Sequence, residues 1–320
     1  MRKIKRLIKS FFRLVLPVLL LVVLAAASAS TWLVHETAQP KVAAYLVTPE
    51  KYGQLSARAA QITDETWTNH DGTIARGWLL RGAEGAPAVI LLHKYGADRS
   101  YCLNLGVKLS EATNFTVLMP DERGHGENPP VKYTSFGGRE ADDTLAAIDF
   151  LRTVKTTDQI PLVGKMFGVY GVEMGAVAAL IATTQNPEIK VLVLDSVPQG
   201  SDGVLSEAVS KRFPFASVVT SKFAKYGANI YFYDGSYKQE ALCTEAKTIS
   251  NRKVLLLAGR DAPNFQESTS KLSKCLQVGS DTEAKTDLSP SGYSITDASL
   301  EQAEAYDQRV IDFFRAGFGG

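Results

Sequence analysis

The stretch Val169 to Leu180 reads VYGVEMGAVAAL and has the pattern of one sharp turn. An apolar run ends at Tyr170, glycines stand at positions 171 and 175, and a run of small apolar residues typical of a buried helix follows directly. Glycine lacks a Cβ, so it fits positions where a flanking side chain would collide with a tight turn. We therefore expect a strand, then a turn whose central residue Glu173 has a strained backbone with positive φ, then a helix.

Short continuous apolar runs recur along the chain, separated by helical patterns. Such runs are typical of strands buried on both faces of a parallel sheet. The expected strands cover Pro87 to Leu92, Thr116 to Met119, Phe167 to Tyr170, Val191 to Leu194 and Val254 to Leu257. The expected helices cover Leu103 to Thr113, Glu140 to Arg152, Met174 to Thr184 and Leu300 to Phe314. Because the two kinds alternate, the sequence predicts an α/β fold with a doubly wound, mostly parallel sheet, preceded by a hairpin over residues 62–80.

The N-terminus has the composition of a membrane anchor. No charged residue lies between Leu14 and Val34, which is long enough to cross a bilayer as a helix. Six basic residues precede it: Arg2, Lys3, Lys5, Arg6, Lys9 and Arg13. By the positive-inside rule, residues 1–13 form a cytoplasmic tail, residues 14–34 a single transmembrane helix in the cell membrane, and the rest lies outside the cytoplasm. The alternative is a signal peptide cleaved near Ala27-Ser28-Ala29, which would release a secreted protein.

The remainder is expected to be a polar linker over residues 35–52 and one domain over residues 53–320. The interval of about 197–252 is too long for a simple crossover between strands, so we expect a small helical lid there. The formal net charge is +1, and setting aside the six N-terminal charges leaves −5 for the body. A mildly acidic body argues against nucleic-acid binding.

Cysteine usage indicates neither a disulfide framework nor a zinc site. Cys102, Cys243 and Cys275 are too few and too scattered for either. A pair between Cys243 and Cys275 stays open, since spacing alone cannot show it. No spacing motif indicates a metal site, and nothing in the sequence indicates a cofactor.

Polar residues follow the carboxyl end of each expected strand, which is where ligand-binding and catalytic residues usually lie in sheets of this type. In chain order they are His93, Lys94 and Tyr95, then Asp121, Arg123 and His125, then Glu173 and Met174, then Asp195, then Asp261. This order of motifs resembles the α/β-hydrolase superfamily, and within it the bacterial membrane-anchored serine hydrolases of the esterase and peptidase type. The resemblance runs from Gln61 to Phe314. It rests on Asp121, Arg123, Gly124, His125 and Gly126, on Glu140 with Asp143, on the two glycines of the turn and on Asp261.

The resemblance implies roles for these residues. It places a nucleophile elbow at Glu173 and the triad acid at Asp261. It assigns His93, Lys94, Tyr95 and Met174 to the oxyanion pocket, and Asp121, Arg123 and His125 to a structural loop.

Three departures from the family pattern point to a degenerate triad. Glu173 stands in place of the nucleophilic serine, Lys94 replaces a glycine of the oxyanion loop, and no histidine follows His125. We expect Tyr293 at the position of the missing histidine, and a phenol with a pKa of about 10 is a poor base at neutral pH. His93 and His125 are expected to hold their loops through hydrogen bonds.

The acquired carboxylate needs compensation. Glu173 would repel Asp261, so we expect Lys94 to form an ion pair with Glu173 that fills the former oxyanion site. Asp195 is expected to hydrogen-bond loop amides, with a role as a second acid as the alternative.

These patterns favour a membrane-tethered protein that binds a small-molecule or peptide ligand, or another partner, without catalysis. The first alternative is an active hydrolase of ester, amide or peptide bonds with a non-standard site, as fold analogy suggests. The second is Glu173 acting as a general acid or base in a non-hydrolytic reaction.

Overall fold

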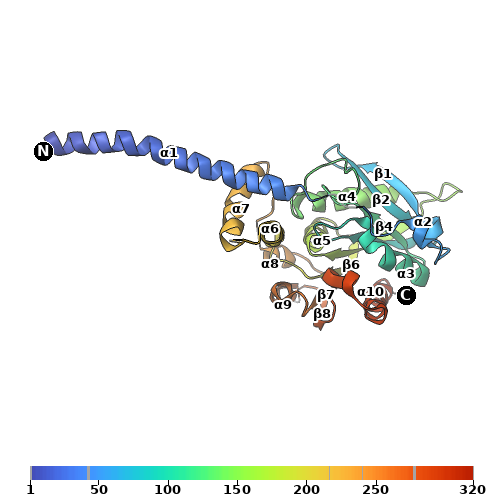
Figure 1. The fold of residues 1–320 in the computed structure, drawn as a ribbon. Coiled ribbons are helices and arrows are strands. Elements are labelled where there is room, and N and C mark those ends of the chain that lie inside the picture. Colours follow the sequence, from blue (N-terminus) through green and yellow to red (C-terminus); the bar gives the residue numbers. More distant parts are fainter. Residues whose placement is uncertain (1, 42–43, 216, 240, 277–278, 320) are drawn as a thin grey trace. The chain divides into compact units, whose positions relative to one another are not determined.

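The computed structural model describes residues 2–41, 44–215, 217–239, 241–276 and 279–319. Figure 1 shows the chain, which divides into two compact units. The anchor unit comprises Met1–Thr37 and Leu205–Asp234, and the sheet unit comprises Ala38–Val204 and Gly235–Gly320.

The anchor unit is built on one long helix, α1 (Arg2–Ala38), and on α7 (Ser217–Tyr231). The stretch Phe11–Ala38 of α1 is the one helix of the described residues that is long and apolar enough to cross a membrane. A signal sequence near the N-terminus would have the same length and composition. The helix runs on to Ala38, beyond the boundary at Val34 that the sequence predicts, and includes Pro17.

The sheet unit contains, within the described residues, an eight-stranded sheet in the order β1-β2-β4-β3-β5-β6-β7-β8. Its strands are β1 (Thr63–Thr68), β2 (Ile74–Leu80), β3 (Ala86–Leu92), β4 (Thr116–Pro120), β5 (Val163–Val172), β6 (Ile189–Asp195), β7 (Lys253–Gly259) and β8 (Asp281–Leu288). The pairs β1–β2 and β2–β4 are antiparallel, and the other pairs are parallel. The predicted mostly parallel α/β sheet is therefore confirmed.

Helices cover both faces of this sheet. On one face, α3 (Leu103–Thr113) and α10 (Leu300–Gly317) pack together (Figure 1). A second group of helices forms a row in which each helix packs against the next. In order they are α4 (Gly138–Thr153), α5 (Met174–Gln185), α8 (Leu242–Ala246) and α9 (Pro263–Leu276). Successive side chains of a strand point to opposite faces, so Leu91 joins the core beneath α3 and α10 whereas Leu92 lies against Gly175 of α5. The described part of the chain also contains the short helix α2 (Pro49–Tyr52), the helix α6 (Ser201–Arg212) and three 3-10 helices.

The sequence patterns predict neither β8 nor α9. β8 reads DTEAKTDL, and as the edge strand it has mostly exposed or half-buried residues. A polar edge strand lacks the continuous apolar run by which the inner strands are recognised. The interval of about 197–252, expected as a lid, contains α6, α7 and α8, and its middle part belongs to the anchor unit.

A disulfide joins the two helices α8 and α9. It links Cys243 to Cys275 with a Cα–Cα distance of 5.5 Å, within the usual range. Cys102 is buried and free. The pairing that the sequence leaves open is therefore made in the structure.

Candidate functional site

Glu173 occupies the sharp turn between β5 and α5. Its φ is +51°, and its side chain is almost completely buried. Glycine is required on both sides: a Cβ on Gly171 would lie 2.3 Å from the carbonyl oxygen of Gly175, and a Cβ on Gly175 would lie 2.7 Å from that of Leu92. The turn geometry expected from the two glycines and the positive φ is therefore present.

The Glu173 carboxylate binds two backbone amides. Its Oε2 accepts hydrogen bonds from the N–H of Met174, at 2.9 Å, and from the N–H of Tyr95, at 2.8 Å. Met174 is the first residue of α5, and Tyr95 lies in the loop that follows β3. One side-chain oxygen of Glu173 thus joins the start of the helix to the neighbouring loop.

Two buried histidines hold the loop that carries Tyr95. His93 uses Nδ1 on the carbonyl of Lys94, at 2.9 Å, and accepts the amide of Glu122 with Nε2, at 3.0 Å. His125 uses Nδ1 on the carbonyl of Arg123, at 2.7 Å, and accepts the amide of Gly96 with Nε2, at 3.0 Å. Because each Nε2 accepts a hydrogen bond, it carries no proton, so each ring is neutral with its proton on Nδ1.

Both histidines are poor acid–base groups. Burial lowers the pKa of His93 to about 4 and, with the neighbouring His93, that of His125 to about 3. Both ring nitrogens of each residue are already bonded to the backbone. This arrangement supports the structural role expected for them.

Lys94 and Tyr293 lie against each other. The ammonium of Lys94 donates to the carbonyl oxygen of Tyr293 at 2.5 Å. It also lies 4.5 Å from the ring centre of Tyr293 and 5.0 Å from that of Tyr101, within range of a cation–π attraction. The ring of Tyr293 packs edge-on against Phe265 at 5.1 Å. An ion pair between Lys94 and Glu173 stays a prediction, because the contacts described for both side chains are with other groups.

Asp261 accepts its described side-chain hydrogen bond from a serine, Ser291. Its Oδ2 accepts a hydrogen bond from Ser291 Oγ at 2.7 Å, and its Oδ1 accepts one from the Ser291 amide at 3.1 Å. Ser291 is fully buried and stands two positions before Tyr293. The described partner of the Asp261 carboxylate is therefore Ser291. The roles of Asp261 as triad acid and of Tyr293 at the histidine position stay predictions.

Asp195, at the end of β6, is completely buried. Its carboxylate accepts hydrogen bonds from Ser196 Oγ at 2.6 Å, the Gly292 amide at 2.9 Å and the Tyr306 hydroxyl at 2.9 Å. Burial raises the pKa of Asp195. Asp195 therefore fixes the loop that contains Ser291, which agrees with the expected bonding to loop amides.

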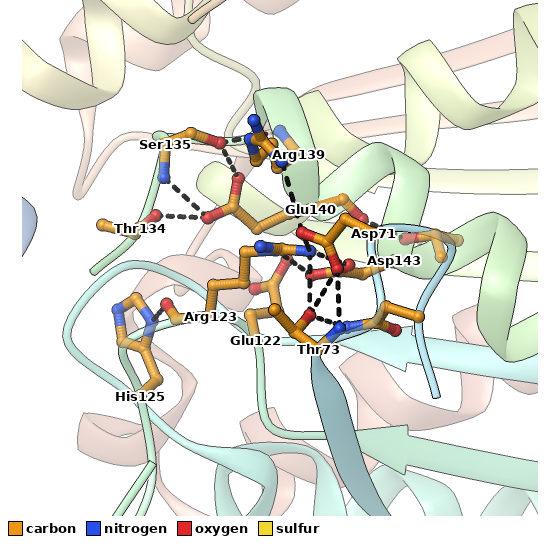
Figure 2. Close-up of polar contacts among 12 residues, drawn as sticks. Asp71, Thr73, Glu122, Arg123, His125, Thr134, Ser135, Arg139, Glu140 and Asp143 are labelled. Atoms are coloured by element: carbon orange, nitrogen blue, oxygen red, sulfur yellow. Dashed lines mark hydrogen bonds and ion pairs between the residues drawn. The ribbon is translucent and has the colours of Figure 1, made fainter. Parts of the chain in front are cut away.

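Arg123 and Glu140 form the polar cluster of Figure 2. The guanidinium of Arg123 points between two carboxylates and contacts Asp143 at 2.5 and 2.6 Å and Asp71 at 2.8 Å. Glu140 points away from it and accepts hydrogen bonds from Thr134 Oγ1 and from both the amide and the hydroxyl of Ser135. Burial raises the pKa of Asp143 to about 7.

Asp121, at the carboxyl end of β4, joins three segments. It accepts hydrogen bonds from Tyr45, from Arg76 and from the amide of Arg99, each at 3.0 Å. Asp121, Arg123 and His125 therefore each bind neighbouring segments through hydrogen bonds, and the structural role that the resemblance implies for them stays a prediction.

Comparisons with known proteins identify the architecture. No family model matches the chain. The thiohydrolase apmlB of Arthrinium phaeospermum is 25% identical over 124 residues, which span 38% of this chain and 39% of that enzyme. The esterase PF2001 of Pyrococcus furiosus superposes with a TM-score of 0.66 at 23% identity, covering 88% of this chain and 98% of the esterase. A dienelactone hydrolase of Anabaena variabilis gives a TM-score of 0.55 at 14% identity, covering 80% of this chain and 99% of the hydrolase.

The chain has the α/β-hydrolase fold. The similar structures superpose over most of their own length. In this chain Glu173 follows β5 and Asp261 follows β7. At these levels of sequence identity, the structural similarity shows a shared fold and does not show a shared activity.

Glu122 contributes a buried carboxyl group to this α/β-hydrolase fold. Neither of its oxygens has a hydrogen-bond partner among the described residues, and the same is true of Trp67 Nε1 and Asn69 Oδ1. All three residues line a narrow cavity of about 30 Å³, enough for about two waters. Burial, with added repulsion from Glu140, raises the pKa of Glu122 well above its usual range. Glu173 is not among the residues that line this cavity.

Some of these residues were not found by sequence reasoning. Ser291, Tyr306 and Glu122 have no motif of their own, although Ser291 directly precedes Gly292 and Glu122 follows Asp121. In the described part of the chain, no group of three or more His, Cys, Asp or Glu side chains is arranged to hold a metal ion.

Proposed function

We propose that this chain is a membrane-anchored, extracytoplasmic α/β-hydrolase-fold protein that binds a ligand or partner and does not catalyse hydrolysis. One observation carries the proposal: Glu173 Oε2 accepts the amides of Met174 and Tyr95. In α/β-hydrolases two backbone amides bind the substrate oxyanion. One belongs to the residue after the nucleophile, and the other belongs to the loop that corresponds to the loop after β3 in this chain. On this assignment, residue 173 is the nucleophile elbow and its own carboxylate fills the oxyanion hole.

A filled oxyanion hole removes the largest part of the catalytic apparatus. Amides aimed at developing negative charge are usually the largest single source of rate enhancement in acyl transfer. Here Oε2 of Glu173 already holds both amides, so neither amide is available to a substrate oxyanion. The nucleophilic hydroxyl is also missing, so two of the requirements of acyl transfer are lost at one residue.

A base is missing as well. His93 and His125 are neutral and bonded through both ring nitrogens, and Asp261 holds Ser291. Acyl transfer by a triad needs a group near neutral pKa that takes a proton and returns it to the leaving group. The described residues around Glu173 supply no such group.

The location outside the cytoplasm is supported by two features. The apolar part of α1 follows six basic residues, which favours an inside N-terminus. The disulfide between Cys243 and Cys275 is typical of an oxidising compartment. Cleavage of α1 as a signal peptide would also place the sheet unit outside, so a retained anchor is the finer part of this proposal.

The second candidate is an active hydrolase, which the similarity to an esterase and a thiohydrolase favours. A carboxylate can be a nucleophile, but the resulting acyl or alkyl intermediate needs an activated water to release it. Glu173 would first have to leave the two amides that it binds.

The experiment is labelling with a fluorophosphonate, which reacts with activated serine hydroxyls. Wild-type full-length protein in detergent should remain unlabelled. Glu173→Ser, combined with Ser291→His to place an imidazole beside Asp261, should gain labelling. Glu173→Ser with Tyr293→His is the matched comparison, because it tests the other position of the missing histidine. Labelling of the wild-type protein would contradict the proposal and favour the active hydrolase.

A further inference from the structure

Within the anchor unit, helix α7 contacts one short part of α1, from Ser30 to His35. Gly227 approaches α1 so closely that a Cβ there would lie 2.3 Å from the carbonyl oxygen of Ser30. The hydroxyl of Tyr231 lies 3.0 Å from Nδ1 of His35. Between them, these contacts cover Ser30 to His35, a length of about 8 Å at 1.5 Å per residue.

The segment before α7 meets α1 at the same level. Arg212 forms an ion pair with Glu36 at 2.8 Å, and the ring of Phe213 lies 6.3 Å from that of Trp32. Both ends of the α7 segment therefore contact the short stretch from Trp32 to Glu36.

The face of α7 turned away from α1 is apolar and exposed. Ala224 and Ala228 are completely buried, and with Gly227 they form the side that packs. The opposite stripe, with the residues flanking the helix, contains large hydrophobic side chains that are 44% to 91% exposed: Phe215, Val218, Val219, Phe223, Tyr226, Ile230 and Tyr233. Within α7, Val219, Phe223, Tyr226 and Ile230 recur at spacings of three and four residues, so they share one face of the helix.

The level of these contacts matches a membrane surface. A hydrocarbon core of about 30 Å needs about 20 helical residues, and counting these from Phe11, where the apolar stretch begins, reaches Ser30. Trp32 follows directly and is 56% exposed, as is typical of tryptophans at the boundary between lipid and water. α7 is therefore attached to α1 where α1 would leave the bilayer.

We propose that α7 lies in the outer interface of the membrane that α1 crosses, with its aromatic and aliphatic stripe inserted at the boundary between headgroups and acyl chains. The inference rests on the retained anchor of the proposed function. Amphipathic helices with aromatic and aliphatic residues on one face and lysines beside it bind membrane surfaces in this manner, and Lys222 and Lys225 flank the stripe. The chain would then be held at two points, which fixes the anchor unit at the bilayer surface.

The test uses full-length protein in phosphatidylcholine vesicles and a fluorophore whose emission is quenched by nitroxide lipids. Three variants each receive one new cysteine: Tyr226→Cys on the stripe, Leu20→Cys within α1 and Glu301→Cys on an exposed position of α10. The new thiol is the reactive one, because Cys102 is buried and the other two cysteines are paired. The label at residue 226 should be quenched by nitroxide lipid about threefold more than the label at residue 301, and should be shielded from aqueous iodide.

The outcomes separate this inference from the proposed function. If the label at residue 20 is quenched by lipid and the label at residue 226 behaves like that at residue 301, α7 is in water and the inference is wrong. If the label at residue 226 is shielded from both lipid and iodide, protein covers the stripe, which also overturns the inference. If the label at residue 20 escapes lipid quenching, the retained anchor of the proposed function is wrong, and this inference is wrong with it.

Discussion

At the scale of single residues, the Glu173 side chain caps α5, and in the proposed function it also fills the oxyanion hole. Its Oε2 binds the amide that begins α5 and an amide of the adjacent loop. A side chain that caps a helix stabilises it, and an ionised acceptor is also favoured by the helix dipole. The residue that would end catalysis therefore has a reason to remain as part of the fold.

This dual role predicts an order of stability among variants. Glu173→Ala removes the acceptor and leaves two amides unpaired, so it should lower the free energy of unfolding by about 1–3 kcal/mol. Glu173→Gln keeps a side-chain oxygen and is the matched control, with a smaller loss. Urea unfolding followed by circular dichroism measures both. Equal losses for the two variants would show that the amides do not depend on this acceptor.

Glu122 gives a prediction that depends on pH. Its pKa is raised well above 4.5 in the folded protein, mainly by burial, so the folded state holds a proton that the unfolded state has lost. That contribution to stability is complete below pH 4.5 and is lost as pH rises through the raised pKa. Glu122→Gln should therefore gain in stability relative to wild type as pH rises above 4.5. Unfolding free energies from pH 5 to pH 9 test this, and a difference that does not change with pH would show that Glu122 titrates normally.

Sequence patterns predicted the turn residue but not its partners. Gly171 and Gly175 predict the turn, because the clash that a side chain would cause there involves residues close in sequence. The identity of residue 173 as a glutamate is given by the sequence itself. The partner of Asp261 could not be read in this way. Whether Ser291 or Tyr293 reaches Asp261 depends on the path of the loop after β8, a polar edge strand without an apolar signal.

At the scale of elements, the inner strands were predicted because each is buried on both faces. β3 to β7 each contain a continuous apolar run, and the structure confirms a strand at each of the five expected places. Strand order was not predicted in detail, since it depends on pairing between runs that look alike in sequence. The edge strand β8 and the amphipathic helix α9 depend on the tertiary contacts that they make.

The disulfide gives a prediction at this scale. It joins α8 to α9 and closes a loop of 32 residues in sequence separation. Loop-closure entropy then gives about 3–4 kcal/mol of stabilisation. The double variant Cys243→Ser with Cys275→Ser should unfold at lower urea concentration than the oxidised wild type, and the wild type with reductant should approach it. Identical unfolding of wild type with and without reductant would mean that the bond does not form.

At the scale of the whole molecule, two units are joined in one chain, and they have different surroundings. The anchor unit has the apolar surfaces of α1 and α7, and the sheet unit has the α/β-hydrolase fold. Tethering holds a binding protein at high local concentration near the membrane, which is an advantage that does not require turnover. A ligand or partner on the same membrane surface would bind without diffusing through bulk solution.

The central claim is that the Glu173 carboxylate closes the hydrolytic site, and turnover tests it most directly. Purified full-length wild type and Glu173→Gln are compared for release of p-nitrophenol from p-nitrophenyl esters and of thiol from acyl thioesters. The account predicts that neither protein exceeds the rate of the buffer alone. Hydrolysis by the wild type that is abolished in Glu173→Gln would contradict it, because Glu173 would then be a catalytic group.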